Sequence, residues 1–341
     1  MTSKQIDIAI VGAASLAGEA VLSLLAERKF PVGKLYAVDL VEQSGSHVEF
    51  KDEPVVIHEL ADFDFSVVQL AIFLLDGPKA VEYAPKATQS GCIVIDSSIG
   101  FRYEDDVPLI IPGLNDELIG DYRERMILSI PSSAAYQLIK ILEPIHQAVG
   151  ANEVTVCVMQ PVSEQGKPGQ EELGRQTAQL LNFQNADKQV YPSQIAFNTI
   201  LHSGILLEGG YTSDELDIVK ATHKILNNDK ISISPTVVTV PVFFGNSSIV
   251  QIGTQEPLGA DKAAEILDNI PGVRLTQTTQ TQPMTPVDNA SGKSELVVSR
   301  IRNSISGDEK YLNLCSVVDN IQGGVALNSV QTAEILVKDY L

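Results

Sequence analysis

The strongest constraint on the fold is a strand, a glycine turn and a helix near the N-terminus. Residues 6–11 (IDIAIV) form a short apolar run, residues 12–18 (GAASLAG) place a glycine at each end of a turn, and residues 19–28 have helical character. Such a unit begins a parallel sheet whose strands are joined by right-handed crossovers. Later segments continue the alternation, with strands expected at residues 34–40, 67–75 and 92–96 and a helix at 78–89. The pattern predicts an α/β fold that opens with a Rossmann-like parallel sheet.

The glycine turn leaves two interpretations open. A dinucleotide fingerprint has a middle glycine where the backbone approaches the pyrophosphate, and that position is Ser15 here. A tight βα connection with no ligand would use the same outer glycines. Asp39 ends the second strand, and no Lys or Arg lies between Asp39 and Lys51 to pair with a 2′-phosphate. No cofactor is certain, and NAD is favoured over NADP if one binds, through Gly12, Ser15, Leu16, Ala17, Gly18 and Asp39.

Size, charge and cysteine content limit the functional class. A chain of 341 residues exceeds the usual single core, so two domains are expected. The formal charge of -19 argues against nucleic acid or an anionic membrane as a partner, and leaves a small-molecule ligand open. Cys92, Cys157 and Cys315 form no close CxxC pair, so we expect reduced thiols and no metal site. No basic leader or membrane-spanning apolar run is evident, which predicts a cytoplasmic protein.

A second strand-to-helix turn, within residues 129–142 (SIPSSAAYQLIKIL), places two hydroxyls at a helix N-terminus. Pro131 favours an extended residue before it, and an apolar helical run follows Ser132 and Ser133. Helix N-termini present unpaired N–H groups, so the turn can hold a nucleophile beside oxyanion donors. Serine is also a preferred N-cap, and capping is the simpler explanation of this stretch alone.

Five segments together resemble the aspartate-semialdehyde dehydrogenase family, and most closely its Usg-type paralogues. They are GAASLAG at 12–18, DSSIGFRYEDDVPLIIPGLN at 96–115, PSSAAYQ at 131–137, IAFN at 195–198 and DNIQGGVALN at 319–328. The resemblance covers essentially the whole chain. It implies a Rossmann-like dinucleotide-binding-type domain at residues 1–131 with 320–341. It also implies a central α/β (α+β) catalytic and dimerisation domain at 132–319, and hence a homodimer.

The family's chemistry, carried over by resemblance, falls on altered residues. A cysteine thiolate attacks the aldehyde in the family, and that position is Ser133. The family's proton-managing histidine corresponds to Asn246, and Gln160 matches a glutamine near the nucleophile. A serine hydroxyl needs an adjacent base, and asparagine cannot act as a base near neutral pH.

The implied substrate-binding positions also change. Thr239 stands where the family has an arginine for the substrate carboxylate, and Asp217 where it has a lysine. Arg102 matches the phosphate-binding arginine, although a surface or interface ion pair explains it equally well.

The resemblance also places residues near the nicotinamide. Ser163 and Glu164 correspond to a serine–glycine pair beside it, where Glu164 adds bulk and negative charge. Asn320 belongs to the closing motif, and we group it with Ser163 among the cofactor-binding positions.

These substitutions lead us to expect a homologue without aspartate-semialdehyde dehydrogenase activity that keeps the fold and the dimer. The alternative is an active NAD(P)-dependent oxidoreductase of this type in amino-acid biosynthesis. A serine hydrolase that uses Ser133 ranks third, since the sequence shows no base for it. Neither His202 nor His223 falls in a motif that assigns it a role.

Overall fold

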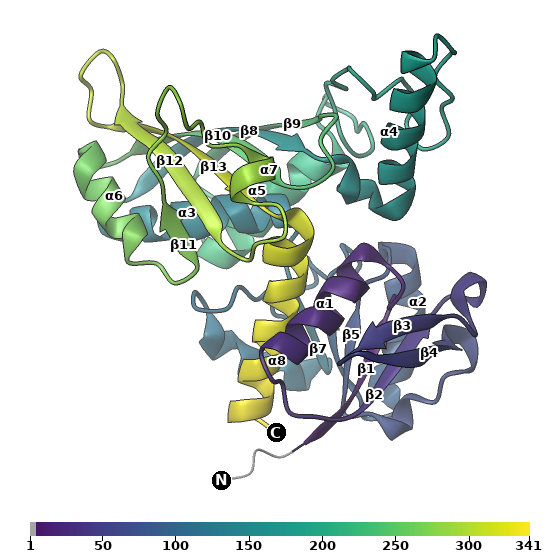
Figure 1. The fold of residues 1–341 in the computed structure, drawn as a ribbon. Coiled ribbons are helices and arrows are strands. Elements are labelled where there is room, and N and C mark those ends of the chain that lie inside the picture. The colour runs from purple at the N-terminus through teal and green to yellow at the C-terminus, as the bar shows by residue number, and fades with distance from the viewer. Residues whose placement is uncertain (1–4) are drawn as a thin grey trace. The chain divides into compact units, whose positions relative to one another are not determined.

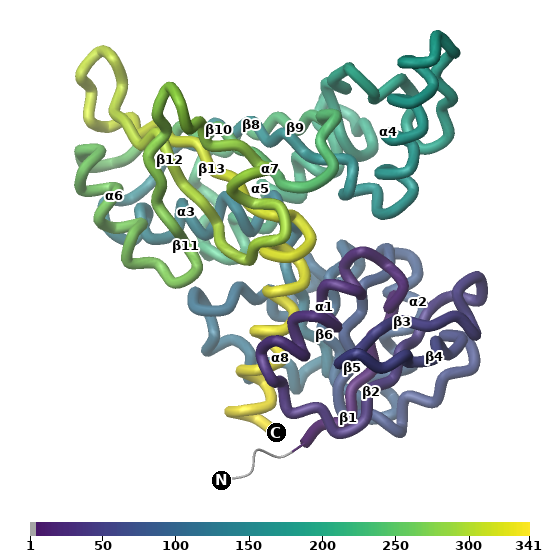
Figure 2. Tube along the Cα trace, viewed as in Figure 1, coloured from purple at the N-terminus to yellow at the C-terminus, as the bar shows by residue number. Residues whose placement is uncertain are grey.

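The computed structural model describes residues 5–341, in which the chain divides into two compact units (Figure 1). The first unit is Met1–Ser132 with Val325–Leu341, and the second is Ser133–Gly324. The C-terminal segment thus returns to complete the unit that the N-terminal segment begins, as the colours of the trace show (Figure 2). Within residues 5–341, no helix is both long enough and apolar enough to span a bilayer.

The first unit is built on a seven-stranded sheet in the order β3-β4-β2-β1-β5-β6-β7. Its elements are β1 (Ile6–Val11), α1 (Leu16–Glu27), β2 (Val32–Asp39), β3 (His47–Phe50), β4 (Glu53–Glu59), β5 (Leu70–Phe73), α2 (Gly77–Gln89), β6 (Ile93–Asp96), β7 (Ile127–Ser129) and α8 (Leu327–Asp339). All neighbouring strands pair in parallel except β3 and β4, which are antiparallel. This confirms the predicted Rossmann-like sheet.

The central strand β1 is buried on both faces because helices cover each side of the sheet. Ile8 and Ile10 pack in a core that includes residues of α1 and α8. Ala9 and Val11 point to the other face, into a core that includes residues of α2. The nearly continuous apolar sequence of β1 follows from this double burial.

The second unit is built on a six-stranded mixed sheet in the order β11-β12-β13-β10-β8-β9. Its elements are α3 (Ser133–Val149), β8 (Ala151–Gln160), α4 (Gly166–Leu181), α5 (Ser213–Leu226), β9 (Ser232–Thr239), β10 (Asn246–Thr254), α6 (Ala260–Asp268), β11 (Val273–Leu275), α7 (Pro286–Asn289), β12 (Leu296–Asn303) and β13 (Tyr311–Val318). The helices α3, α5 and α6 pack together on one face of the sheet. The expected mixed second domain is therefore confirmed.

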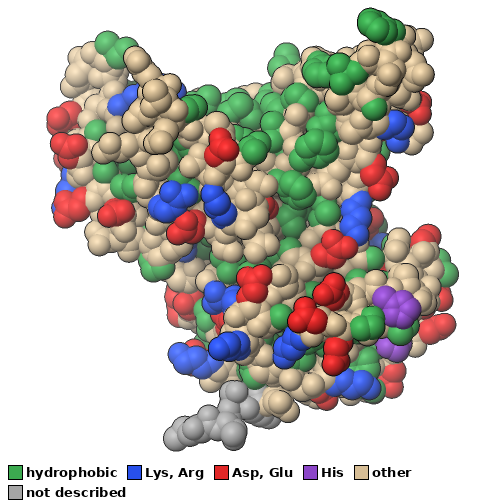
Figure 3. Space-filling view, in the orientation of Figure 1, with side chains coloured by type: hydrophobic (Ala, Val, Ile, Leu, Met, Phe, Trp, Pro, Cys, Tyr) green, Lys and Arg blue, Asp and Glu red, His purple; other side chains and the backbone are tan. Residues whose placement is uncertain are grey.

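The other face of this sheet is open over its central strands. Ile249 of β10 pairs in register with Cys157 of β8 on one side and Cys315 of β13 on the other, and it is 49% exposed. The residues next to it in β10, Ser248 and Val250, are buried on the helix-covered face. Hydrophobic side chains gather on the surface of the second unit (Figure 3).

A buried carboxylate fixes the loop that follows α4. Glu172 lies in α4, and its carboxylate accepts hydrogen bonds from the backbone N–H groups of Gln189, Val190 and Tyr191, at 2.9, 2.5 and 3.2 Å. The Gln176 amide donates a further bond to Glu172 at 2.9 Å. Without the carboxylate, the buried Tyr191 N–H and the partly buried N–H groups of Gln189 and Val190 would lose their acceptor.

We therefore expect Glu172→Ala to lower the free energy of unfolding by about 3 kcal/mol, because it leaves buried donors unsatisfied. Urea denaturation with limited proteolysis at residues 183–196 measures the effect. The matched control is Glu171→Ala, since Glu171 is the exposed neighbour in the same helix. Equal midpoints for the two variants would show that the loop does not depend on this carboxylate.

Candidate active site

The predicted catalytic positions meet at one edge of the second unit's sheet. β8 ends at Gln160 and its parallel neighbour β9 ends at Thr239, and these two residues are partners across the strands. β10 runs antiparallel to β8, so its first residue, Asn246, lies at the same edge. α3 begins at Ser133 on the helix-covered face of this sheet. Strand topology alone therefore brings Gln160 together with Thr239 and Asn246, which lie 79 and 86 positions further along the chain.

Ser133 is held between two polar side chains. Its Oγ donates a hydrogen bond to Glu164 Oε1 at 2.8 Å, and it accepts one from Asn246 Nδ2 at 2.6 Å. A Cβ placed on Gly324 would lie 2.5 Å from Ser133 Cβ, so the chain packs closely on the other side as well. The structure thus joins two predicted residues, Ser133 and Asn246, and adds a carboxylate as their partner.

Glu164 comes from the short helical turn Val162–Gln165 that follows β8. Desolvation by the surrounding protein raises its pKa to about 7, and the negative charge of Asp214 acts in the same direction. Hydrogen bonds from Ser133, Asn246 and Asn320 oppose the rise. Protein surrounds the carboxyl group, which causes this desolvation. The residue as a whole nevertheless keeps solvent-accessible surface, so water still reaches the side chain. A carboxyl with a pKa near neutrality can exchange protons at physiological pH.

Amide side chains line the same edge. Asn320 Oδ1 accepts hydrogen bonds from Ser163 Oγ at 3.0 Å and from the Gly245 N–H at 3.1 Å, which places both predicted cofactor-binding residues, Ser163 and Asn320, in one network. Among residues 5–341, Gln160 Oε1 and Asn246 Oδ1 are buried at this edge without a hydrogen-bond partner. Polar groups of a bound ligand would satisfy such atoms.

The implied substrate-binding residues occupy separate settings. Thr239 is buried at the end of β9, where Oγ1 donates a long hydrogen bond of 3.5 Å to the His202 carbonyl. Asp217 is buried within α5. Arg102 belongs to the first unit and is buried, with Nε and Nη2 donating to the Ile130 and Ser97 carbonyls at 3.1 and 2.7 Å. The interpretation of Arg102 as a surface residue is therefore wrong.

The glycine turn of the first unit suits a dinucleotide. Gly12 has a φ of +87°, and a Cβ there would lie 2.8 Å from the Leu74 carbonyl oxygen. Ser15 turns its side chain back onto the helix and accepts from the Gly18 N–H at 3.0 Å as the N-cap of α1. Asp39 Oδ2 accepts from the Ala14 N–H at 2.8 Å, which ties the end of β2 to the turn. Ser15 thus takes up one N–H of this helix N-terminus, while the tight turn at Gly12 lets a phosphate approach the rest, so the residues fit the group.

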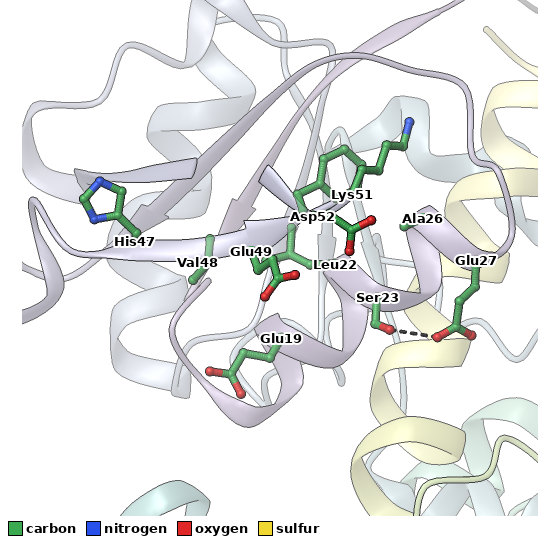
Figure 4. A pocket seen from close by; sticks show the side chains of 11 residues that line it. Glu19, Leu22, Ser23, Ala26, Glu27, His47, Val48, Glu49, Lys51 and Asp52 are labelled. Carbon is green, nitrogen blue, oxygen red and sulfur yellow. Dashed lines mark hydrogen bonds between the residues drawn. The ribbon is translucent and has the colours of Figure 1, made fainter. Parts of the chain in front are cut away.

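A different hollow lies in the first unit, between α1 and the edge strand β3 (Figure 4). Glu19 and Glu27 reach it from α1, and Glu49 and Asp52 from β3 and the turn after it. Neither Gly12 nor Asp39 lines it, so it is distinct from the glycine turn.

Comparison with known proteins agrees with this geometry. The family model for the semialdehyde dehydrogenase NAD-binding domain matches residues 7–122, and the model for the semialdehyde dehydrogenase dimerisation domain matches residues 142–322. The chain belongs to the aspartate-semialdehyde dehydrogenase family. A Legionella pneumophila protein named aspartate-semialdehyde dehydrogenase is 42% identical over 99% of this chain and 98% of its own length.

Two further relatives come from Vibrio cholerae. The protein named aspartate-semialdehyde dehydrogenase 2 is 38% identical over 99% of both chains. The crystal structure described as aspartate semialdehyde dehydrogenase II complexed with ASA superposes with a TM-score of 0.96 at 38% identity, covering 99% of this chain and 100% of that one.

These relatives correct our expectation of an inactive homologue. Full-length proteins 38–42% identical to this chain are named aspartate-semialdehyde dehydrogenases, which favours the active alternative. Their names do not single out the Usg-type paralogues. The physical reason for the error is Glu164: we judged Ser133 to lack a base, whereas the structure places a carboxylate on its hydroxyl. Only a contact between residues distant in sequence reveals this partner.

The raised pKa of Glu164 predicts how stability depends on pH. The folded carboxyl keeps its proton up to about 7, whereas the unfolded value is 4.5. The folded state therefore binds the proton more tightly, and wild-type stability falls, relative to Glu164→Gln, as pH rises from about 4.5 to about 7. Denaturation of both proteins across this window tests the prediction, with Glu171→Gln as control. A constant difference between wild type and Glu164→Gln would contradict it.

Proposed function

We propose that this chain is an active NAD(P)-dependent oxidoreductase of the aspartate-semialdehyde dehydrogenase family, with Ser133 as nucleophile and Glu164 as its base. The hydrogen bond from Ser133 Oγ to Glu164 Oε1, 2.8 Å long, carries this proposal. A hydroxyl becomes an effective nucleophile when a base of suitable pKa accepts its proton. The names of the full-length relatives support the same reaction class.

The residues of the site divide the chemistry among them. Ser133 Oγ adds to the aldehyde carbon while Glu164 accepts the hydroxyl proton. Asn246 Nδ2, which donates to Oγ at 2.6 Å, stabilises negative charge that develops on this oxygen. The N-terminus of α3 favours negative charge on the former aldehyde oxygen. A bound nicotinamide would accept the hydride, and the product on the protein is an acyl ester of Ser133.

The dinucleotide would be held by the first unit. The N-terminus of α1 and the turn at Gly12 favour the pyrophosphate, and Asp39 at the end of β2 favours a ribose hydroxyl. We propose NAD over NADP because a carboxylate at this position repels a 2′-phosphate.

Aspartate semialdehyde is the substrate proposed by the relatives' names, with a role in amino-acid biosynthesis. Gln160, which matches a glutamine near the family's nucleophile, supports a similar substrate-binding site at the end of β8. Thr239 and Asp217 supply no positive charge for the substrate carboxylate, so this chain must hold that group differently.

The first activity test is aspartate semialdehyde with NAD and with NADP, followed by absorbance of the reduced cofactor. We expect turnover with a preference for NAD, and a loss of about a thousandfold or more in Ser133→Ala. Ser90→Ala, an exposed serine at the end of α2, is the control and should keep full activity. Turnover that survives Ser133→Ala would exclude this serine as the nucleophile.

We further propose that the second unit forms a homodimer through the open face of its sheet. Ile249, Cys157 and Cys315 form an apolar strip there, and the family model that matches this region is named a dimerisation domain. Other large hydrophobic side chains of the second unit are also strongly exposed, with Phe197 at 68% and Leu201 at 77%. Apolar area of this kind commonly marks an interface.

Accordingly, Ile249→Asp should convert a dimer to a monomer at micromolar concentration, because it buries a charge in an apolar contact. Analytical ultracentrifugation measures the change. Val41→Asp introduces the same charge at an exposed valine of the first unit and should leave the dimer intact. A dimer that persists in Ile249→Asp would place the interface elsewhere.

A further inference from the structure

The charged groups around Ser133 influence which molecule can accept the acyl group from its Oγ. In the family that the chain resembles, phosphate cleaves the acyl intermediate. Here Glu164 Oε1 lies 2.8 Å from Ser133 Oγ, so any acceptor that attacks an acyl carbon on Oγ arrives beside this carboxyl. Asp214 adds negative charge that also acts on Glu164. An incoming phosphate dianion is repelled by these charges, whereas a neutral molecule is not.

The positions that would attract phosphate have lost positive charge or are already engaged. Thr239 and Asp217 replace an arginine and a lysine of the family pattern, and neither carries positive charge. The guanidinium of Arg102 has its Nε and one terminal nitrogen bound to the backbone carbonyls of Ile130 and Ser97. Each of these changes lowers the expected affinity of the site for phosphate.

Water suits the same surroundings. Glu164 first releases to solvent the proton that it took from the Ser133 hydroxyl. Its side chain keeps solvent-accessible surface and its carboxyl lies next to the atom that carries the acyl group, so it can then take a proton from water as the water oxygen attacks the acyl carbon. The bond between Ser133 Oγ and the acyl carbon then breaks, and Oγ recovers the proton from Glu164. The step gives a free carboxylic acid and regenerates the hydroxyl, with no change in oxidation state.

We propose that water, rather than phosphate, is the acyl acceptor at Ser133, so that the chain oxidises its aldehyde to a carboxylic acid and not to an acyl phosphate. This inference rests on the proposed function, because the acyl ester must first form by oxidation. Glu164 is then the base in both halves of the reaction, first for the Ser133 hydroxyl and then for water.

The experiment follows reduced cofactor from aspartate semialdehyde and NAD, with and without phosphate, in water enriched in ¹⁸O. We expect equal rates in both buffers, ¹⁸O in a free carboxylate product, and no acyl phosphate by ³¹P NMR. Turnover that requires phosphate and yields an acyl phosphate would overturn the inference and leave the proposed function standing. Absence of reduced cofactor in both buffers would instead overturn the proposed function, and the inference with it.

A model ester tests the second half without cofactor. Wild type should hydrolyse p-nitrophenyl acetate in phosphate-free buffer, and Ser133→Ala should not. Glu164→Gln keeps the shape of the side chain but removes the base that serves both acylation and hydrolysis, so we expect at least a hundredfold slower ester hydrolysis. Glu171→Gln should behave as wild type. Unchanged hydrolysis in Glu164→Gln would remove Glu164 from this step and contradict the inference.

Discussion

The hydrogen bond between Ser133 and Glu164 is the interaction on which the chemistry proposed for this site depends. It forms because the first residue of α3 lies, in space, beside the end of β8. Ser133 therefore contacts the turn that directly follows that strand. Close packing at Gly324 and the amide of Asn246 hold the serine in place. A hydroxyl in this position would be inert beside neutral groups. Beside a carboxyl whose pKa is raised to about 7, we propose that it acts as a nucleophile near neutral pH.

The replacements in the site form a consistent set. Asn246 can donate a hydrogen bond to Ser133 but cannot take up a proton, so a base must come from elsewhere. In the proposed mechanism Glu164 supplies this base, at a position where the resemblance implies a glycine. In the mechanism that we propose, a serine nucleophile and a carboxylate base take over the roles that the resemblance gives to a cysteine and a histidine. Considered one residue at a time, each substitution indicates loss of activity; considered as contacts, they describe another way to activate an oxygen.

The sequence predicted the local elements well and the site only in part. The strand Ile6–Val11 was predicted at its exact bounds, because an apolar run between polar residues and glycine has few alternatives. α1 begins at Leu16 rather than Glu19, since Ser15 caps it. The β3–β4 hairpin was not predicted, because its short strands alternate weakly. The role of Glu164 could not be predicted, since sequence alone did not show that its carboxyl reaches Ser133, thirty-one positions away.

The strand β10 contributes to both proposed roles of the second unit, catalysis and dimerisation, because its side chains alternate between the two faces of the sheet. Asn246, Ser248 and Val250 share the buried face that α3 covers, and Asn246 reaches Ser133 from it. Ile249 lies on the opposite face, between Cys157 and Cys315. Because neighbouring side chains in a strand point to opposite faces, the chain can present an apolar surface to a partner without disturbing the amide at the catalytic edge. A mixed sheet with one open face can therefore carry the proposed dimer surface and the proposed active site on the same backbone.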